Sequence, residues 1–153
     1  MNATITVQVR RLSPRVGEEI PLPFYATAGA AAMDLCACLE QETVIPPLGR
    51  ARIPTGIAVA IPAGVVGLVF ARSGNAYRAG ISLSNAVGVI DSDYRGEIQV
   101  LLSNLDPQRA FVVRPGDRIA QLAFLPVLHA QLAEVEELAP TARGEGGFGS
   151  TGS

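Results

Sequence analysis

The stretch EIQVLL, residues 97–102, carries an apolar side chain at every second position. Successive side chains of a β-strand point to opposite faces, so this spacing places Ile98, Val100 and Leu102 together on one face. The segment TITVQVR, residues 4–10, repeats the same period of two. We therefore expect both segments to form half-buried strands, with one face against a core and the other toward solvent.

Other short apolar runs extend the strand pattern over most of the chain. Residues 51–62, 65–72 and 118–127 are rich in Val and Ile and are bounded by Pro or Gly. The 16 glycines and 11 prolines fall at turn-like positions such as PPLG and RPGD, which is typical of an all-β sandwich or barrel. We predict an all-β fold with at most one short helix, at residues 73–80. Residues 130–138, AQLAEVEEL, fit a helix or a strand equally well.

Composition excludes several classes of protein. The net charge of −2 lacks the basic excess that binding to a nucleic acid polymer demands. No run approaches the roughly 18 apolar residues of a membrane-spanning helix, and the N-terminal segment has no secretory signal pattern, so we expect a cytoplasmic protein. Cys36, Cys38 and His129 lack the neighbouring ligands that a metal site requires, and we expect them to be structural.

The stretch VGVIDSDYRGE, residues 87–97, concentrates charge in a chain of which only 17% of residues are charged. Its Asn, Asp and Gly residues predict a tight β-hairpin around residues 85–88 and a second turn at residues 93–96. Asp91 follows an apolar run, where a carboxylate is costly unless it is solvated, paired or used. Taken singly, these charges are also consistent with a surface ion pair of little energetic consequence.

Two further segments have groups suited to an anion. In ARSGNAYRAG, residues 71–80, a guanidinium, a hydroxyl and free backbone N–H groups meet at a strand-to-helix junction; a simple turn is the alternative. The tail PTARGEGGFGSTGS, residues 140–153, has the glycine spacing of a dinucleotide-binding turn but no following helix. Its cation, aromatic ring and hydroxyls favour a flexible arm over an anionic, aromatic ligand, and a disordered end is the alternative.

Five segments together resemble the five motifs of the trimeric dUTP diphosphatases, or dUTPases, in order and approximate spacing. They are AAMDLCA, ARSGNA, GVIDSDYRGE, RIAQL and RGEGGFGSTG, and they span residues 31–152. The resemblance implies a jelly-roll-like β-barrel at residues 1–138 and a flexible C-terminal arm at residues 139–153. It also implies a homotrimer with active sites shared between subunits. The implied reaction is hydrolysis of dUTP to dUMP and pyrophosphate, which keeps uracil out of DNA and supplies dUMP for dTMP synthesis.

The resemblance implies a role for each matching residue. Asp91 resembles the general base that activates a water for attack on the α-phosphorus. Tyr94 resembles the ring that packs on the deoxyribose and leaves no space for a 2′-hydroxyl. The remaining matches are substrate-binding positions: the uracil pocket at Asn85, Val89 and Ile90; the phosphate contacts at Arg72, Ser73, Gly74 and Gln121; a weaker, substrate-proximal match at Gln99; and the arm at Arg143, Phe148, Ser150 and Thr151.

The implied cofactor is Mg²⁺, carried by the substrate triphosphate and waters, so we expect no protein metal ligand. Asp34, in the first motif, is expected to have a supporting structural role. The chain departs from the family pattern at Ala71, where proline is usual, and at Asn75, where an apolar residue is frequent. Ala32 stands where glycine is common. These departures flank the residues that are expected to carry the chemistry, and they affect the expected local loop geometry.

Two alternative functions remain. A dCTP deaminase has the same fold and a related arginine-serine motif but uses a glutamate for deamination, and the uninterrupted third and fifth motifs count against it. The other alternative is a jelly-roll binding module without catalytic activity, and the presence of Asp91, Tyr94 and the complete tail counts against that. Release of ammonia from dCTP distinguishes the deaminase from the hydrolase.

Overall fold

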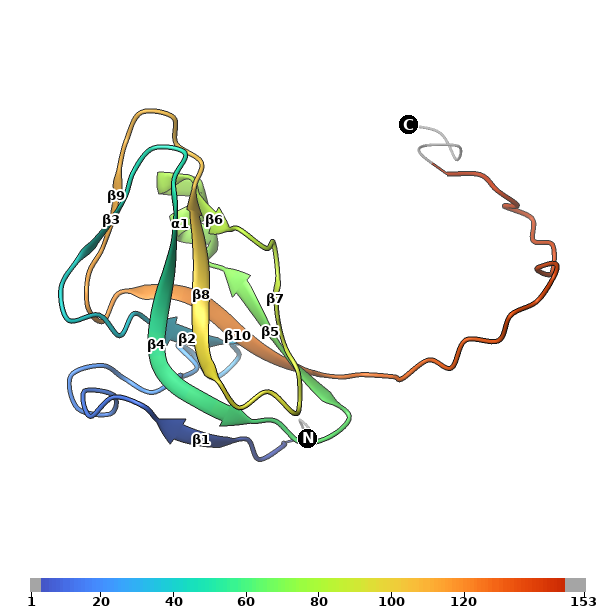
Figure 1. Ribbon diagram of the computed structural model, residues 1–153, viewed down its shortest axis with the longest axis horizontal. Helices are drawn as coiled ribbons and strands as arrows, with labels where there is room; N and C mark the ends of the chain where they lie inside the picture. Colours follow the sequence, from blue (N-terminus) through green and yellow to red (C-terminus); the bar gives the residue numbers. More distant parts are fainter. Residues whose placement is uncertain (1–3, 148–153) are drawn as a thin grey trace.

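The computed structural model describes residues 4–147, and it consists of antiparallel β-strands with one short helix (Figure 1). The predictions of an all-β fold and of a helix near residues 73–80 are confirmed. The elements, in chain order, are β1 Gln8–Arg11, β2 Met33–Cys36, β3 Thr43–Ile45, β4 Arg50–Ala60, β5 Val65–Ala71, α1 Ser73–Ala79, β6 Ile81–Leu83, β7 Gly88–Ile90, β8 Glu97–Asn104, β9 Phe111–Val113 and β10 Arg118–Pro126.

The strands form two four-stranded sheets and one two-stranded sheet. The first sheet has the order β1-β4-β8-β6, the second has the order β2-β10-β5-β7, and β3 pairs with β9. Long strands lie at the centre of each large sheet, with β4 beside β8 and β10 beside β5 (Figure 1). Most of these neighbours are far apart in the sequence, so the sheets depend on long-range contacts.

The core lies between the two large sheets, and β8 shows why. Its side chains alternate between partly buried and buried along the whole strand, as the sequence predicts. Ile98 is 0% exposed, and Val100 and Leu102 are each 1% exposed. They belong to one apolar cluster with Val69 of β5 and Leu122 of β10, in the opposite sheet. Burial of such side chains is the main stabilising contribution in a fold of this kind.

The predicted hairpin around residues 85–88 is wrong, although the turn itself is present. The Ala86 N–H donates to the Leu83 carbonyl over 3.1 Å, and Ala86 has a positive φ of 60°. The flanking strands do not pair with each other, because β6 pairs with β8 in one sheet and β7 pairs with β5 in the other. The chain therefore crosses between sheets at this turn, which opens a space between β7 and β8.

The two ends of the described chain lie outside the core. The predicted N-terminal strand is shorter than expected, because β1 begins at Gln8, and all four of its residues are exposed at a sheet edge. Residues 130–138 form neither the helix nor the strand that their pattern allows. After β10 the chain runs away from the barrel as an extended tail as far as residue 147 (Figure 1). The boundary at residues 138 and 139 stays a prediction.

Candidate active site

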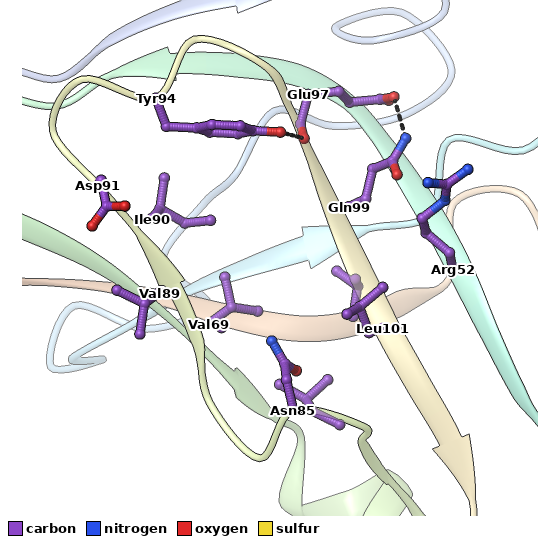
Figure 2. A pocket seen from close by; sticks show the side chains of 13 residues that line it. Arg52, Val69, Asn85, Val89, Ile90, Asp91, Tyr94, Glu97, Gln99 and Leu101 are labelled. Atoms are coloured by element: carbon purple, nitrogen blue, oxygen red, sulfur yellow. Dashed lines mark hydrogen bonds between the residues drawn. The ribbon is translucent and has the colours of Figure 1, made fainter.

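A pocket of about 250 Å³ opens between β7, the following loop and β8 (Figure 2). Six of the residues that the sequence predicts to form the site line this pocket and so lie together in three dimensions. They are Asn85, Val89, Ile90, Asp91, Tyr94 and Gln99. Arg52, Val69 and Glu97 are among the other residues of its wall.

The edge of β7 supplies backbone groups to this pocket. Within residues 4–147, β7 is the last strand of its sheet and pairs only with β5, through Gly88, Val89 and Ile90. On its outer side, away from its partner, an edge strand carries N–H and C=O groups that no neighbouring strand satisfies. The Val89 side chain is 61% exposed, so the pocket wall at this point combines peptide groups with an apolar surface.

Tyr94 is held in place by one hydrogen bond from its backbone and one from its side-chain hydroxyl. Its backbone N–H donates to the Asp91 carbonyl over 3.2 Å, and its hydroxyl donates to the Glu97 carbonyl over 3.0 Å (Figure 2). The ring lies against Gly96, where a Cβ atom would be only 2.6 Å from the ring atom Cζ of Tyr94. Only glycine leaves room for the ring in this position.

Glu97 connects the pocket to the sheet, and the motif comparison did not assign it a role. Its Oε1 accepts a hydrogen bond from the Gly56 N–H over 2.8 Å, and its Oε2 accepts one from Gln99 Nε2 over 3.0 Å. The sequence indicates the contact between Glu97 and Gln99, because the period of two in β8 puts both residues on the same side of the strand. The contact with Gly56 joins residues 41 positions apart, which no local pattern indicates.

A second group of predicted residues surrounds Asp34, which is only 2% exposed. Its Oδ1 accepts hydrogen bonds from Arg72 Nε over 3.3 Å and from Gln121 Nε2 over 3.4 Å, and its Oδ2 accepts one from Arg118 over 3.1 Å. A buried carboxylate needs such partners, because its desolvation is otherwise expensive. Asp34 thereby fixes the orientation of Arg72 and Gln121, both predicted phosphate contacts. Arg118 was not singled out from the sequence.

The other predicted phosphate residues adjoin this cluster. Ser73 and Gly74 begin α1 directly after Arg72, and the Asn75 side chain donates to the Arg118 carbonyl over 3.3 Å. The Arg78 guanidinium folds back over Gly74, since a Cβ atom at Gly74 would lie 2.9 Å from Nη2 of Arg78. The segment from Arg72 to Gly74 therefore lies among three guanidinium groups, an arrangement that attracts anions.

Cys36 lies two residues after Asp34 and is buried, and both cysteines are free thiols. Burial raises the pKa of the Cys36 thiol, and the Asp34 carboxylate raises it further. The thiol is therefore neutral at physiological pH. Among residues 4–147, no group of three or more His, Cys, Asp or Glu side chains is arranged to hold a metal ion. The helix of this part of the chain is too short and too polar to cross a membrane.

The two groups lie at opposite ends of β5. The register pairs Ile90 with Gly67, so Asp91 lies beside the start of β5, whereas Arg72 follows its last residue. At about 3.3 Å per residue, the six steps from position 66 to position 72 separate the two ends by roughly 20 Å. A single chain therefore does not bring Asp91 and Arg72 to the same phosphate group.

Of the predicted arm residues, the structure describes only Arg143. Arg143 is exposed in the tail, and its Nε donates to the Gly146 carbonyl over 2.7 Å. The tail that follows β10 runs away from the barrel (Figure 1). Phe148, Ser150 and Thr151 lie outside the residues that the structure describes.

Comparison with known proteins identifies the family. A family model described as dUTPase matches residues 18–152, which is most of the chain. The chain belongs to the dUTPase family. Among similar dUTPases, the deoxyuridine 5′-triphosphate nucleotidohydrolase of Idiomarina loihiensis is 50% identical over 147 residues, covering 95% of this chain and 97% of that protein. The corresponding protein of Cronobacter sakazakii is 44% identical over 147 residues, covering 95% and 96%.

Solved dUTPase structures share the fold. The dUTPase of Staphylococcus bacteriophage 80alpha with dUpNHpp superimposes with a TM-score of 0.82 at 28% identity, covering 98% of this chain and 100% of that chain. A mutant dUTPase of phage phi11 of S. aureus, described with a structural Mg(II) ion, gives a TM-score of 0.75 at 26% identity. That comparison covers 87% of this chain and 98% of the phage chain.

We predict that Asp34→Ala lowers the free energy of unfolding by about 1–3 kcal/mol, because Arg72, Arg118 and Gln121 lose their common acceptor while remaining partly accessible to water. Urea unfolding followed by circular dichroism measures this change. The control is Glu42→Ala, which removes an exposed carboxylate 3.8 Å from Arg114 and is expected to change stability by less than about 0.5 kcal/mol. Equal losses in the two variants would contradict a special role for the buried carboxylate.

Proposed function

We propose that this protein hydrolyses dUTP to dUMP and pyrophosphate, with Asp91 as the general base. Membership of the dUTPase family over residues 18–152 supports the activity. The observation that supports the residue assignment is that Asp91, Tyr94 and the open edge of β7 lie in the same pocket (Figure 2). The residue roles below belong to this proposal.

Uracil binds, in this proposal, along the backbone of β7 near Val89 and Ile90, with Asn85 at the same wall. A fixed row of peptide donors and acceptors is suited to the alternating donor and acceptor groups of the uracil pairing edge. Cytosine would present the wrong groups and leave buried polar atoms unpaired, which is a larger penalty than the loss of an apolar contact. Gln99 lines the same pocket and is placed near the base.

Tyr94 is proposed as the wall against the sugar. Its hydroxyl is bonded to the Glu97 carbonyl and its ring rests on Gly96, so the ring cannot move aside without breaking a contact. A deoxyribose packs against such a wall, whereas the 2′-hydroxyl of a ribose would collide with it. The preference for dUTP over UTP follows from this steric exclusion.

Asp91 accepts the proton of the attacking water. Its carboxylate is exposed at the rim of the pocket, where water reaches it. The water oxygen forms a bond to the α-phosphorus while the bond to the bridging oxygen of the β-phosphate breaks. The products are dUMP and pyrophosphate, and the proton passes to Asp91. A positioned general base typically contributes 10² to 10⁴-fold to such a reaction.

The phosphates are bound by Arg72, Ser73, Gly74 and Gln121. Two of these side chains are oriented by Asp34. Phosphoryl transfer requires positioning and neutralisation of the phosphate oxygens, which guanidinium groups and backbone N–H groups supply. Mg²⁺ is the cofactor of the family; carried by the triphosphate with its own waters, it supplies further neutralisation.

The active site is proposed to be shared between copies of the chain in a homotrimer. Asp91 and Arg72 lie roughly 20 Å apart along β5, so a second copy is needed to bring a carboxylate and a phosphate site to one triphosphate. The third contribution is the C-terminal arm, residues 139–153, with Arg143, Ser150 and Thr151 at the phosphates and Phe148 stacked on the base. The enzyme is proposed to act in the cytoplasm.

A nucleotide panel tests the activity. With Mg²⁺ and added pyrophosphatase, we expect phosphate release from dUTP and little from UTP, dTTP or dCTP, because the base edge and the sugar wall reject them. Phosphate release and ammonia release are measured in parallel. Ammonia from dCTP would indicate a deaminase, no turnover of any nucleotide would indicate a binding module, and equal turnover of UTP would contradict the role of Tyr94.

We predict that Asp91→Asn reduces turnover of dUTP by at least about 10²-fold, because the amide cannot accept the proton from water. Binding of a non-hydrolysable dUTP analogue, measured by calorimetry, is expected to stay within about 10-fold of the wild type, since binding rests mainly on other groups. Substantial turnover by this variant would refute the assignment of the base.

Truncation after Pro140 tests the arm. Removal of residues 141–153 is expected to abolish most of the activity and to leave the thermal unfolding of the barrel unchanged, because residues 127–147 form no strand within it. Steady-state turnover and circular dichroism melting measure the two effects. Near-normal turnover by the truncated protein would show that the arm is dispensable.

A further inference from the structure

Glu97 is a hub of hydrogen bonds at the base of the Tyr94 wall. Its two carboxylate oxygens accept from Gly56 N–H over 2.8 Å and from Gln99 Nε2 over 3.0 Å. Its backbone carbonyl accepts from the Tyr94 hydroxyl over 3.0 Å. One residue therefore joins Gly56 of β4, the strand β8 and the tyrosine of the pocket. Figure 2 shows the contacts with Gln99 and Tyr94.

The carboxylate of Glu97 is partly buried and is bonded to neutral donors. Among the described residues, none of the ion pairs involves Glu97. A carboxylate removed from water without a cation is costly, so its presence here calls for a reason other than charge pairing. A carboxylate only accepts hydrogen bonds, which dictates the direction of both contacts: Gly56 and Gln99 must donate.

Gly56 is a rigid anchor for this contact. It lies where the register between β4 and β8 shifts, and it has a positive φ of 71°. A Cβ atom at this position would lie 2.7 Å from Cys38 Sγ and 2.7 Å from Val16 Cγ2, so the backbone is closely surrounded. The hydrogen bond from Gly56 therefore fixes the start of β8, and with it the Glu97 carbonyl, relative to the core.

Tyr94 depends on that carbonyl for its position. Tyr94 is 44% exposed, so packing alone does not restrict its ring on the outer side. The Gly96 contact limits movement toward the backbone, and the hydrogen bond to the Glu97 carbonyl limits movement outward. Displacement of the carbonyl would let the ring tilt and open space beside the sugar.

We infer that Glu97 is a positioning residue for sugar selectivity: its side chain, anchored on Gly56, holds the carbonyl that tethers the Tyr94 ring against the 2′ position. This inference rests on the proposed function, in which Tyr94 excludes the 2′-hydroxyl. It assigns to Glu97 no contact with substrate. Its consequence is that the loss of the side chain weakens discrimination between dUTP and UTP.

The test compares kcat/KM for dUTP and UTP on each preparation of enzyme. The ratio of the two is independent of the fraction of protein that is folded, so a purely structural role would leave it unchanged. For Glu97→Ala we expect the dUTP to UTP ratio to fall roughly 5- to 10-fold, the size of one hydrogen bond's net contribution. Glu97→Met, which keeps the side-chain length, is expected to give the same fall and replaces the shorter variant if that one does not fold.

Three further variants test whether Glu97 acts on selectivity through Tyr94. Tyr94→Phe removes the hydroxyl that bonds to the Glu97 carbonyl, and it is expected to lower the dUTP to UTP ratio by a similar factor. In the double variant Tyr94→Phe with Glu97→Ala, the ratio should be no lower than in the single variant that has the lower ratio. Glu97→Gln keeps an acceptor for Gly56 and a partner for Gln99, so it is expected to restore the ratio to within about 2-fold of the wild type. Glu42→Ala, which removes an exposed carboxylate remote from the pocket, is the matched control and should leave the ratio unchanged.

An unchanged ratio in Glu97→Ala or Glu97→Met, with a wild type that prefers dUTP, would overturn the inference and leave the proposed function standing. Multiplying effects in the double variant would also overturn it, because they would show that Glu97 and Tyr94 act independently. A wild type that hydrolyses UTP and dUTP equally well would contradict the proposed role of Tyr94 in excluding the 2′-hydroxyl, and it would also overturn this inference.

Discussion

The apolar face of β8 must be shielded from water, and the rest of the structure is arranged around that requirement. Ile98, Val100 and Leu102 are almost fully buried between two sheets, and full burial of such a side chain contributes about 1.5–3 kcal/mol. Because side chains alternate along a strand, the same segment turns Glu97 and Gln99 to its other face. The strand that supplies the core thus also supplies one wall of the pocket.

Few charged side chains are buried in the described part of the chain, and the two carboxylates of Asp34 and Glu97 each have a structural role. Asp34 of β2 is buried against Arg118 and Gln121 of the neighbouring strand β10 and against Arg72, which follows β5 on the far side of β10. The hydrogen bonds that offset the desolvation of this carboxylate also align the groups proposed to bind phosphate. In the pocket, the partly buried carboxylate of Glu97 is offset by hydrogen bonds from neutral donors.

The length of β5 explains why the site groups of one chain remain apart. A β-strand is extended and is held on both sides by β7 and β10, so the separation of its ends is rigid. Asp91 and Arg72 are fixed at these ends, and no side-chain rotation brings them together. The proposal of a shared site is therefore a consequence of geometry as well as of family membership.

The sequence by itself determined the long central strands, the short helix and the family. The period of two predicted β8, the Pro and Gly boundaries predicted β4, β5 and β10, and α1 ends at Gly80 in the left-handed conformation that glycine adopts readily. Only the tertiary structure decided which segments meet. The turn at residues 85–88 is local, but its flanking strands pair in different sheets, so the hairpin was wrong. Arg118 beside Asp34 and Gly56 beside Glu97 join residues 84 and 41 positions apart, and such contacts arise from the packing of whole sheets, which no short-range pattern of side chains records.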